Sequence, residues 1–138
     1  MSSKAQAPET EADTRSRYIS PALVKSGWQF RADSICEEYY FTDGKILVRG
    51  KSTARGERKK VDYLLLKDEA NRLAVIEAKS TSFSVGHGLQ QAIGYAKRLD
   101  VPFAYSSNGK GFRETDLITG AERGLTIDAF PNPAGLWT

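Results

Sequence analysis

Residues 61–79 read VDYLLLKDEANRLAVIEAK, and this stretch decides the fold. Two short apolar runs, Val61–Leu66 and Leu73–Lys79, flank the polar residues 67–72, which is the pattern of a β-hairpin. Pairing that is symmetric about the junction of residues 69 and 70 places Asp62 directly opposite Glu77. The sequence therefore predicts two carboxylates side by side on adjacent strands.

The paired carboxylates predict a metal site. Opposed residues on neighbouring strands have Cβ atoms roughly 4.5–5.5 Å apart, and two ionised acids at that spacing repel each other. A cation removes the repulsion, and oxygen ligands suit a hard ion such as Mg²⁺. Lys79 shares the strand face of Glu77, so it can orient or deprotonate a water, or offset charge on a phosphate. The alternative is a surface salt-bridge cluster, against which the apolar surroundings argue.

Asp62, followed by Glu77-Ala78-Lys79 at the end of a hydrophobic strand, resembles the signature of PD-(D/E)XK nucleases. More of the chain resembles a narrower family, the N-terminal nuclease domain of the restriction (R, or motor) subunit of type I restriction-modification enzymes. The matching stretches span nearly the whole chain in the expected order: Glu11–Arg15, Tyr18–Leu23, Gly27-Trp28, Val61–Leu66, Val75–Lys79, Gly88–Ala92, Phe130–Pro133 and Leu136-Trp137.

This resemblance implies an α/β fold of the restriction-endonuclease-like PD-(D/E)XK type, in which helices flank a mixed central sheet. It implies Mg²⁺ as the cofactor and double-stranded DNA as the substrate. The implied metal ligands are Asp62, Glu77 and the backbone carbonyl of Ala78, and Lys79 is the implied catalytic lysine.

Two expected helices supply further candidates. Glu11 resembles an accessory catalytic acid of the family, or it is an acid favoured in a first helical turn by the helix dipole and by capping, with Thr10 as N-cap. Gln91 and Tyr95 resemble the Gln-x-x-x-Tyr element of RecB-like nucleases. Their spacing of four residues places both on one helical face, on the flank of the core-facing stripe. We expect these two residues to contact DNA or to support the active site.

A basic segment leads into the Asp62 strand. Between residues 49 and 60, six basic residues stand against one acid, Glu57. We expect the DNA-binding members near the metal to be Arg55, Arg58, Lys59 and Lys60. A flexible, solvated connection between strands explains the composition equally well.

A glycine pattern in the same region resembles a phosphate-binding P-loop. Gly44 precedes Gly50-Lys51-Ser52, but five residues separate the glycines where that motif needs four. A loop, rather than the required helix, is expected over residues 53–56. We therefore predict no ATP site in this chain.

Length and composition predict one soluble domain. The 138 residues are 40% hydrophobic and 27% charged, with a net charge of +3. We expect a disordered polar tail over residues 1–8 and a single nuclease domain over residues 9–138. The apolar runs are far shorter than the ~20 residues that span a bilayer, and the N-terminus lacks a signal-peptide pattern. A single cysteine, Cys36, excludes an internal disulfide, so we expect a cytoplasmic protein without membrane contact.

The expected helices are Glu11–Ile19, Pro21–Lys25 and Val85–Leu99. The expected strands, besides the hairpin, are Ile35–Phe41, Lys45–Val48, Val101–Ser106, Gly111–Thr115 and Leu125–Phe130. We expect Asp43-Gly44 to supply a turn, the last two strands to lie at sheet edges, and Pro131 and Pro133 to break the tail.

Family resemblance also indicates the function. We expect a Mg²⁺-dependent endonuclease domain that hydrolyses phosphodiester bonds of double-stranded DNA. The helicase motor of the family is absent from this chain, as are the regions that reach the methylase and specificity subunits. Isolated activity is therefore expected to be weak or absent. The alternatives are a nuclease-fold module that binds DNA or the complex without cutting, against which the intact acids and lysine argue, and a stand-alone resolvase or RecB-like repair nuclease, against which the family-like tail argues.

Overall fold

The computed structural model describes residues 9–42, 47–49, 52–54 and 58–137. The helical elements are α1 (Glu11–Thr14), the π-helical segment η1 (Arg15–Ile19), α2 (Ser20–Lys25), α3 (Leu89–Leu99) and α4 (Pro133–Trp137). The strands are β1 (Ile35–Thr42), β2 (Leu47–Arg49), β3 (Ser52–Ala54), β4 (Arg58–Asp68), β5 (Asn71–Ala78), β6 (Phe103–Ser107), β7 (Gly111–Asp116) and β8 (Glu122–Thr126). The predictions for the tail 1–8, the Asp43-Gly44 turn, Lys45 and Arg55 fall outside the described residues.

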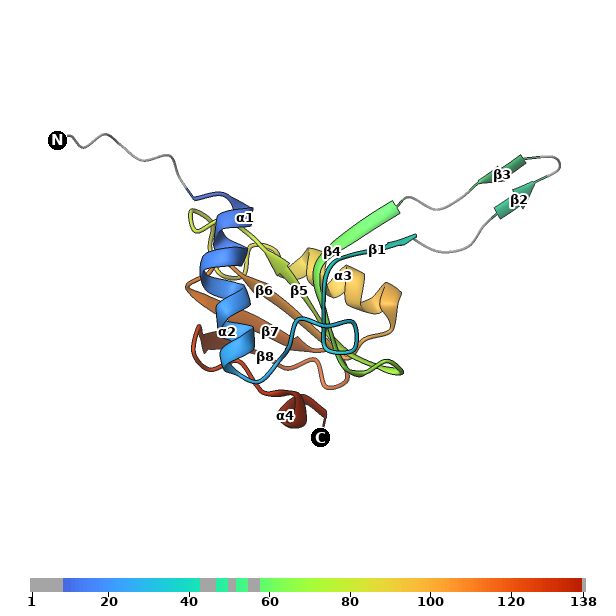
Figure 1. Cartoon of the computed structure of the whole chain (residues 1–138). Helices are drawn as coiled ribbons and strands as arrows, with labels where there is room; N and C mark the ends of the chain where they lie inside the picture. Colours follow the sequence, from blue (N-terminus) through green and yellow to red (C-terminus); the bar gives the residue numbers. More distant parts are fainter. Residues whose placement is uncertain (1–8, 43–46, 50–51, 55–57, 138) are drawn as a thin grey trace.

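Six of the strands form one mixed sheet in the order β1-β4-β5-β6-β7-β8 (Figure 1). Neighbouring strands are antiparallel except β5 and β6, which run parallel. Helix α3 connects those two strands, because parallel neighbours need a crossover that returns the chain. Strands β2 and β3 pair with each other in a separate antiparallel sheet. The predicted fold class, a mixed sheet with flanking helices, is confirmed.

The β4–β5 hairpin adopts the register that the sequence predicts. The paired residues are Tyr63 with Ile76, Leu64 with Val75 and Leu65 with Ala74. A shift of register follows after Leu65, and Asp68 pairs with Asn71 beside the turn. Continuing the regular part of the ladder by one residue brings Asp62 opposite Glu77, which fixes both acids on the central strands of the sheet.

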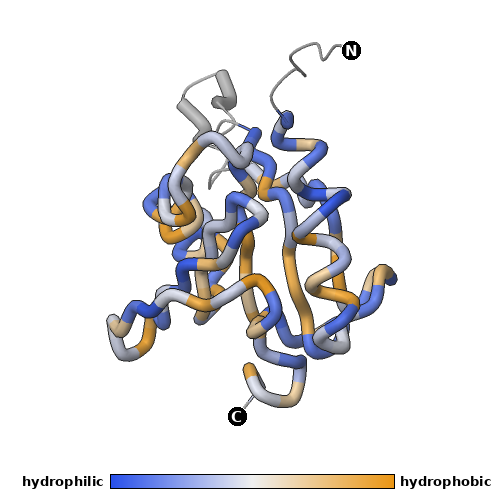
Figure 2. The backbone as a smooth tube through the Cα atoms, turned by 90° about the vertical axis from the view of Figure 1, so that its left-hand side faces the viewer, coloured by the Kyte–Doolittle hydropathy of each residue, from blue (hydrophilic) through white to orange (hydrophobic). Residues whose placement is uncertain are grey.

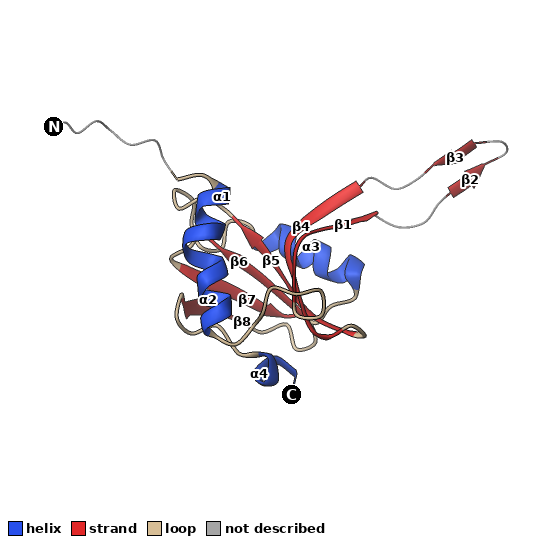
Figure 3. Cartoon of the chain, in the orientation of Figure 1, coloured by secondary structure: helices blue, strands red, loops and turns tan. Residues whose placement is uncertain are grey.

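The sheet separates two hydrophobic cores. Alternate residues of the hairpin, such as Tyr63 and Ile76, pack on one face with Ile19 and Leu23 of the N-terminal helical segments. The residues between them, such as Val75, pack on the other face with the buried side of α3. Helices therefore cover both faces of the strands (Figure 3), and the hydrophobic segments concentrate along the central strands (Figure 2). No helix in the described part of the chain is long and apolar enough to cross a membrane.

Several predicted boundaries differ from the structure. Helix α3 begins at Leu89 rather than Val85, because residues 85–88 form turns. Strand β7 is not an edge strand, since it pairs with both β6 and β8. The last strand is Glu122–Thr126 rather than Leu125–Phe130, and the chain turns after it through a bond from Ala129 N–H to the Thr126 carbonyl.

Two further segments are structured where the sequence predicts breaks. Residues Ser52–Ala54 form strand β3 instead of a loop. The tail forms helix α4, because a proline at the start of a helix gives up an N–H that has no helical partner there. The two predicted N-terminal helices are confirmed, although they join through the π-helical segment without interruption.

Candidate active site

Asp62 and Glu77 lie together on the neighbouring interior strands β4 and β5, and both are buried. The backbone N–H of Asp62 donates to Oε2 of Glu77 at 3.2 Å, and the backbone N–H of Ala78 donates to Oδ2 of Asp62 at 2.8 Å. Each carboxylate is therefore fixed by a backbone donor of the opposing strand. Backbone held by a sheet ladder moves little, so the strands give the two acids a defined mutual position.

Electrostatics distinguish Glu77 from an ordinary glutamate. Burial raises its pKa, and the negative charge of Asp62 raises it further, to about 8. The Asp62 N–H and the charge of Lys79 oppose the rise in the pKa of Glu77, whereas the charge of Glu11 adds to it. Two buried carboxylates this close cannot both ionise easily without a cation beside them.

This donor set fits a hard divalent cation. A cation beside Asp62 and Glu77 would offset both the burial and the mutual repulsion of their charges, and carboxylate oxygens are the ligands that Mg²⁺ prefers. Among the described residues there is no group of three or more His, Cys, Asp and Glu side chains that could hold a metal ion. Two carboxylate ligands suit an ion such as Mg²⁺, because this ion keeps several of its waters.

Lys79 follows directly after β5, and its backbone N–H donates to the carbonyl of Ser107 at 2.9 Å. Its side chain packs against the start of α3, since a Cβ added at Gly88 would lie 3.2 Å from Cε of Lys79 and 3.4 Å from Cβ of Glu77. The structure thus brings this lysine beside Glu77. Glycine at position 88 leaves the space that the lysine side chain occupies.

Glu11 is exposed in the first turn of α1, and its charge reaches Glu77. The N-cap is Thr10, as predicted, and the capping box pairs it with Asp13 rather than with Glu11. The capping role that Glu11 shares in the sequence interpretation therefore belongs to Asp13. Glu11 takes no part in the capping box, but its place in the first turn of α1 still suits the helix dipole.

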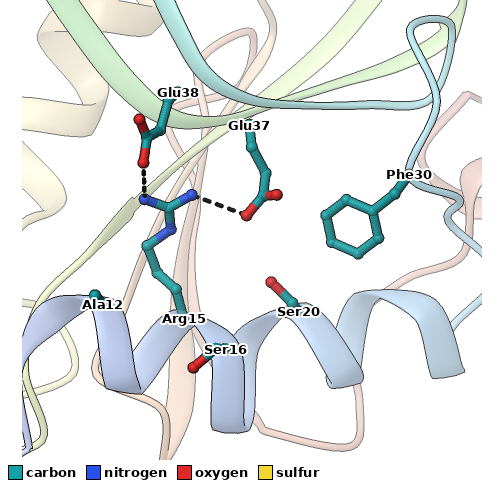
Figure 4. Close-up of a pocket in the computed structure, with 7 residues that line it drawn as sticks. All are labelled: Ala12, Arg15, Ser16, Ser20, Phe30, Glu37 and Glu38. Carbon is teal, nitrogen blue, oxygen red and sulfur yellow. Dashed lines mark hydrogen bonds and ion pairs between the residues drawn. The ribbon is translucent and has the colours of Figure 1, made fainter.

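Arg15 is the site residue that the sequence interpretation misses. Its Nη1 lies 3.9 Å from Oδ1 of Asp62 and 3.0 Å from Oε2 of Glu38, and its Nη2 lies 2.9 Å from Oε2 of Glu37. Figure 4 shows the side chain reaching from the helix to both glutamates, beside a cavity of about 450 Å³. Burial would lower the pKa of Arg15, but its contacts with Tyr63 and the glutamates raise it overall. The sequence offers no specific signal for Arg15, because a lone arginine in a helix has no diagnostic spacing.

Of the four basic residues predicted to bind DNA, three lie on strand β4 and one falls outside the described residues. Nζ of Lys60 lies 3.7 Å from Oδ1 of Asp62, so this lysine borders the candidate site. Arg58 lies on the same strand, with its guanidinium 4.1 Å from the ring centroid of the exposed Tyr40. Lys59 lies between them on β4, and Arg55 falls outside the described residues.

Gln91 and Tyr95 differ in exposure. The amide of Gln91 is exposed and donates to the Tyr95 hydroxyl at 2.8 Å. The Tyr95 ring is buried in the core beneath α3 and meets Phe41 edge to face, with ring centroids 5.4 Å apart. The prediction that Tyr95 lies on the flank of the core-facing stripe is therefore wrong. Its hydroxyl holds Gln91, while its ring packs in the core.

Fold and site together define an α/β domain with a buried pair of strand carboxylates beside a lysine. Residues 29–131 match the family model described as the type I restriction enzyme R protein N terminus. The chain belongs to this family, which confirms the resemblance read from the sequence motifs.

Two relatives are described as subunits of type I restriction enzymes. The type I restriction enzyme EcoAI endonuclease subunit of Escherichia coli is 42% identical over 132 residues, which cover 93% of this chain and 16% of that protein. A solved fragment, described as an HsdR subunit of a type I restriction enzyme from Vibrio vulnificus YJ016, matches with a TM-score of 0.80 and 42% identity. That match covers 96% of this chain and 25% of the solved one. The chain therefore spans a quarter or less of each relative.

Proposed function

We propose that this chain is a PD-(D/E)XK-type endonuclease domain of a type I restriction R subunit, which hydrolyses phosphodiester bonds of double-stranded DNA with Mg²⁺. The observation that carries the proposal is the buried, opposed pair of Asp62 and Glu77 with Lys79 beside them. A binding module has no need to bury two repelling acids at the centre of a sheet. The family of the chain, and a relative that is described as an endonuclease subunit, support the same activity.

In this proposal Asp62 and Glu77 hold the metal, together with the backbone carbonyl of Ala78. When bound, Mg²⁺ supplies positive charge that polarises the phosphate and a coordinated water. The hydrogen bond from the Ala78 N–H keeps one oxygen of Asp62 engaged, which fixes the direction of the other. Glu77 must give up its proton before it can act as an anionic ligand, because burial and Asp62 raise its pKa.

Lys79 is the proposed catalytic lysine. Its ammonium group orients or deprotonates the attacking water, or offsets the charge that develops on the phosphate. Glu11 acts as an accessory acid at the entrance, where its charge already reaches Glu77. Arg15 holds Asp62 from the side of the first helical segment, so it is a positioning residue.

The DNA backbone is proposed to follow the basic end of β4 towards the acids. Arg58, Lys59 and Lys60 contribute positive charge there, which attracts phosphates without regard to sequence. Gln91, exposed and held by the Tyr95 hydroxyl, is a further proposed DNA contact. The methylase and specificity subunits of a type I complex are the proposed protein partners, and the cytoplasm the proposed location.

The proposal is tested by plasmid cleavage. Supercoiled plasmid is incubated with the chain and Mg²⁺, and nicked and linear products are measured for wild type, Glu77→Ala and Lys79→Ala. Matched controls are Glu69→Ala, at the exposed turn of the same hairpin, and Lys97→Ala, on the exposed side of α3. We expect weak cleavage that both site variants abolish and both controls retain.

Two results would contradict this proposal. Cleavage that survives in Glu77→Ala and Lys79→Ala would place the activity elsewhere. Absence of cleavage by the wild type at all protein concentrations, with DNA affinity equal in all variants, would favour a module that holds DNA without cutting it, or a nuclease that cuts only when the motor and the methylase present the duplex.

A further inference from the structure

Two aromatic side chains stack on each other in the loop between β5 and α3. The rings of Phe83 and His87 have centroids 4.5 Å apart and an interplanar angle of 28°. Phe83 is 45% exposed, and His87 is exposed as well. Both lie outside the two hydrophobic cores. The packing of the fold therefore does not explain why a large apolar ring occupies this position.

The loop that carries the rings is fixed by hydrogen bonds. The buried side chain of Asn108 donates to the Phe83 carbonyl at 2.7 Å, and the Phe83 N–H donates to the Ser80 carbonyl at 3.0 Å. The His87 N–H donates to the Ser84 carbonyl at 3.1 Å. The two rings are presented from an ordered backbone, so little conformational freedom is lost when a ligand stacks on them.

The loop that carries the aromatic pair borders the candidate active site. This loop begins directly after Lys79 and ends at Gly88, where an added Cβ would lie 3.4 Å from Cβ of Glu77. A Cβ added at Gly86 would lie 3.2 Å from Cγ of Arg113, so the aliphatic part of this arginine packs against the loop, while its Nη2 lies 3.6 Å from Oε1 of Glu122. An exposed aromatic surface beside the proposed phosphate-binding site and Lys79 has the character of a nucleic-acid contact.

We propose that Phe83 and His87 form a stacking platform for an unpaired nucleobase of the DNA strand whose phosphodiester is held at Asp62 and Glu77. The proposal rests on the proposed function and narrows its substrate to DNA with a base displaced beside the cleaved bond. An aromatic face accepts any base, so the platform is tolerant of sequence. A base inside a paired duplex is covered on both faces by its neighbours, and therefore cannot reach a protein ring unless it leaves the stack.

The test measures binding in EDTA, where Mg²⁺-dependent cleavage is suppressed. Fluorescence anisotropy gives the affinity of the chain for a fully paired duplex and for the same duplex with one unpaired 2-aminopurine. We expect Phe83→Ala to weaken binding of the unpaired-base DNA about tenfold and to abolish quenching of the 2-aminopurine. Affinity for the paired duplex should change less than about twofold, because phosphate contacts dominate there.

Three further variants make the result specific. Phe83→Leu keeps an apolar side chain without a flat ring, so it should lose the quenching while its melting temperature stays near that of the wild type. Phe83→Trp should retain the quenching. Ile118→Ala removes another exposed apolar side chain, 81% exposed at the turn between β7 and β8, and should change neither affinity.

The outcomes separate the platform from the nuclease activity. Equal affinity of wild type and Phe83→Ala for the unpaired-base DNA, or an equal loss for both DNAs, would overturn the platform. The chain could quench 2-aminopurine through Phe83 and yet never cleave plasmid. That result would support the stacking platform and contradict the proposed nuclease activity. Plasmid cleavage without any quenching would support the nuclease activity and contradict the stacking platform.

Discussion

Arg15 connects the first helical segment to Asp62 on β4, because its Nη1 lies 3.9 Å from Oδ1 of this aspartate. The same guanidinium contacts Glu37 and Glu38 on β1, and its side chain is only 12% exposed. One cation therefore compensates three carboxylates from two strands. A cation in this position sets where Asp62 lies and stabilises the fold around it.

Replacing Arg15 by glutamine should lower the free energy of unfolding by about 1–3 kcal/mol, because it removes one of the two cations that the described residues place within 4 Å of the buried Asp62, Lys60 being the other. Urea denaturation at neutral pH measures the loss. Arg17→Gln is the matched control, since Arg17 pairs with Glu9 at 2.8 Å but is 60% exposed, and exposed pairs contribute about 0–1 kcal/mol. Equal losses in the two variants would show that the contact with Asp62 contributes nothing to stability.

The raised pKa of Glu77 makes stability depend on pH. The unfolded value is 4.5 and the folded value about 8, so the folded state favours the protonated acid. This contribution is fully present below pH 4.5 and is lost as pH rises through about 8. Glu77→Gln stays neutral, so its stability relative to wild type should improve by roughly 2–4 kcal/mol between pH 4.5 and pH 8.5 in EDTA. Denaturation curves that run parallel at all pH values would contradict the assignment.

A bound divalent cation should also offset the stability that is lost when Glu77 ionises in the folded state. At pH 8, Mg²⁺ at about ten times its dissociation constant should raise the free energy of unfolding by about 1.4 kcal/mol, because it binds the folded state alone. Thermal melting of the wild type with and without Mg²⁺ measures the shift, and Glu77→Gln should show little of it. Glu69→Gln, at the exposed hairpin turn, is the control that should keep the full shift. A shift of equal size in all three proteins would place the cation elsewhere.

The register of β4 and β5 is predictable because two apolar runs of similar length enclose a polar turn, and slipping one residue would exchange the two faces of the hairpin. The position of β8 is not predictable in the same way, since nearly all its residues are exposed and show no alternation. The burial of Tyr95 cannot be predicted from the sequence either, because it depends on contact with Phe41 from a distant strand.

The role of Arg15 at the site cannot be predicted from the sequence for a related reason. Its partners Glu37 and Glu38 lie 22 and 23 residues away in the chain, and a lone arginine in a helix has no diagnostic spacing. The acids themselves are predictable, because a carboxylate inside an apolar strand stands out in any sequence. What the sequence lacks is the packing of the first helical segment onto the sheet, which decides which cation meets which acid.

Replacing Gly88, at the start of α3, by alanine should reduce plasmid cleavage more than it reduces stability. An added methyl group at Gly88 would meet Cε of Lys79 and Oγ of Ser106, both at 3.2 Å. Because the lysine is the mobile partner, it should move away from the acids at a cost in stability of about 1 kcal/mol. Plasmid cleavage should fall roughly tenfold or more, since small displacements of catalytic groups are costly.

The matched substitution lies six residues further along the same helix. Gly94→Ala adds its methyl group next to Nη1 of Arg98 at 3.3 Å, which is the flexible end of a side chain. Alanine inside a helix is favoured over glycine by roughly 0.5–1 kcal/mol, so this variant should be more stable and cleave as the wild type does. Plasmid cleavage and urea denaturation of both variants decide the matter. If Gly88→Ala and Gly94→Ala cleave equally well, Lys79 does not need the space beside Gly88, and its catalytic role in the proposed mechanism fails.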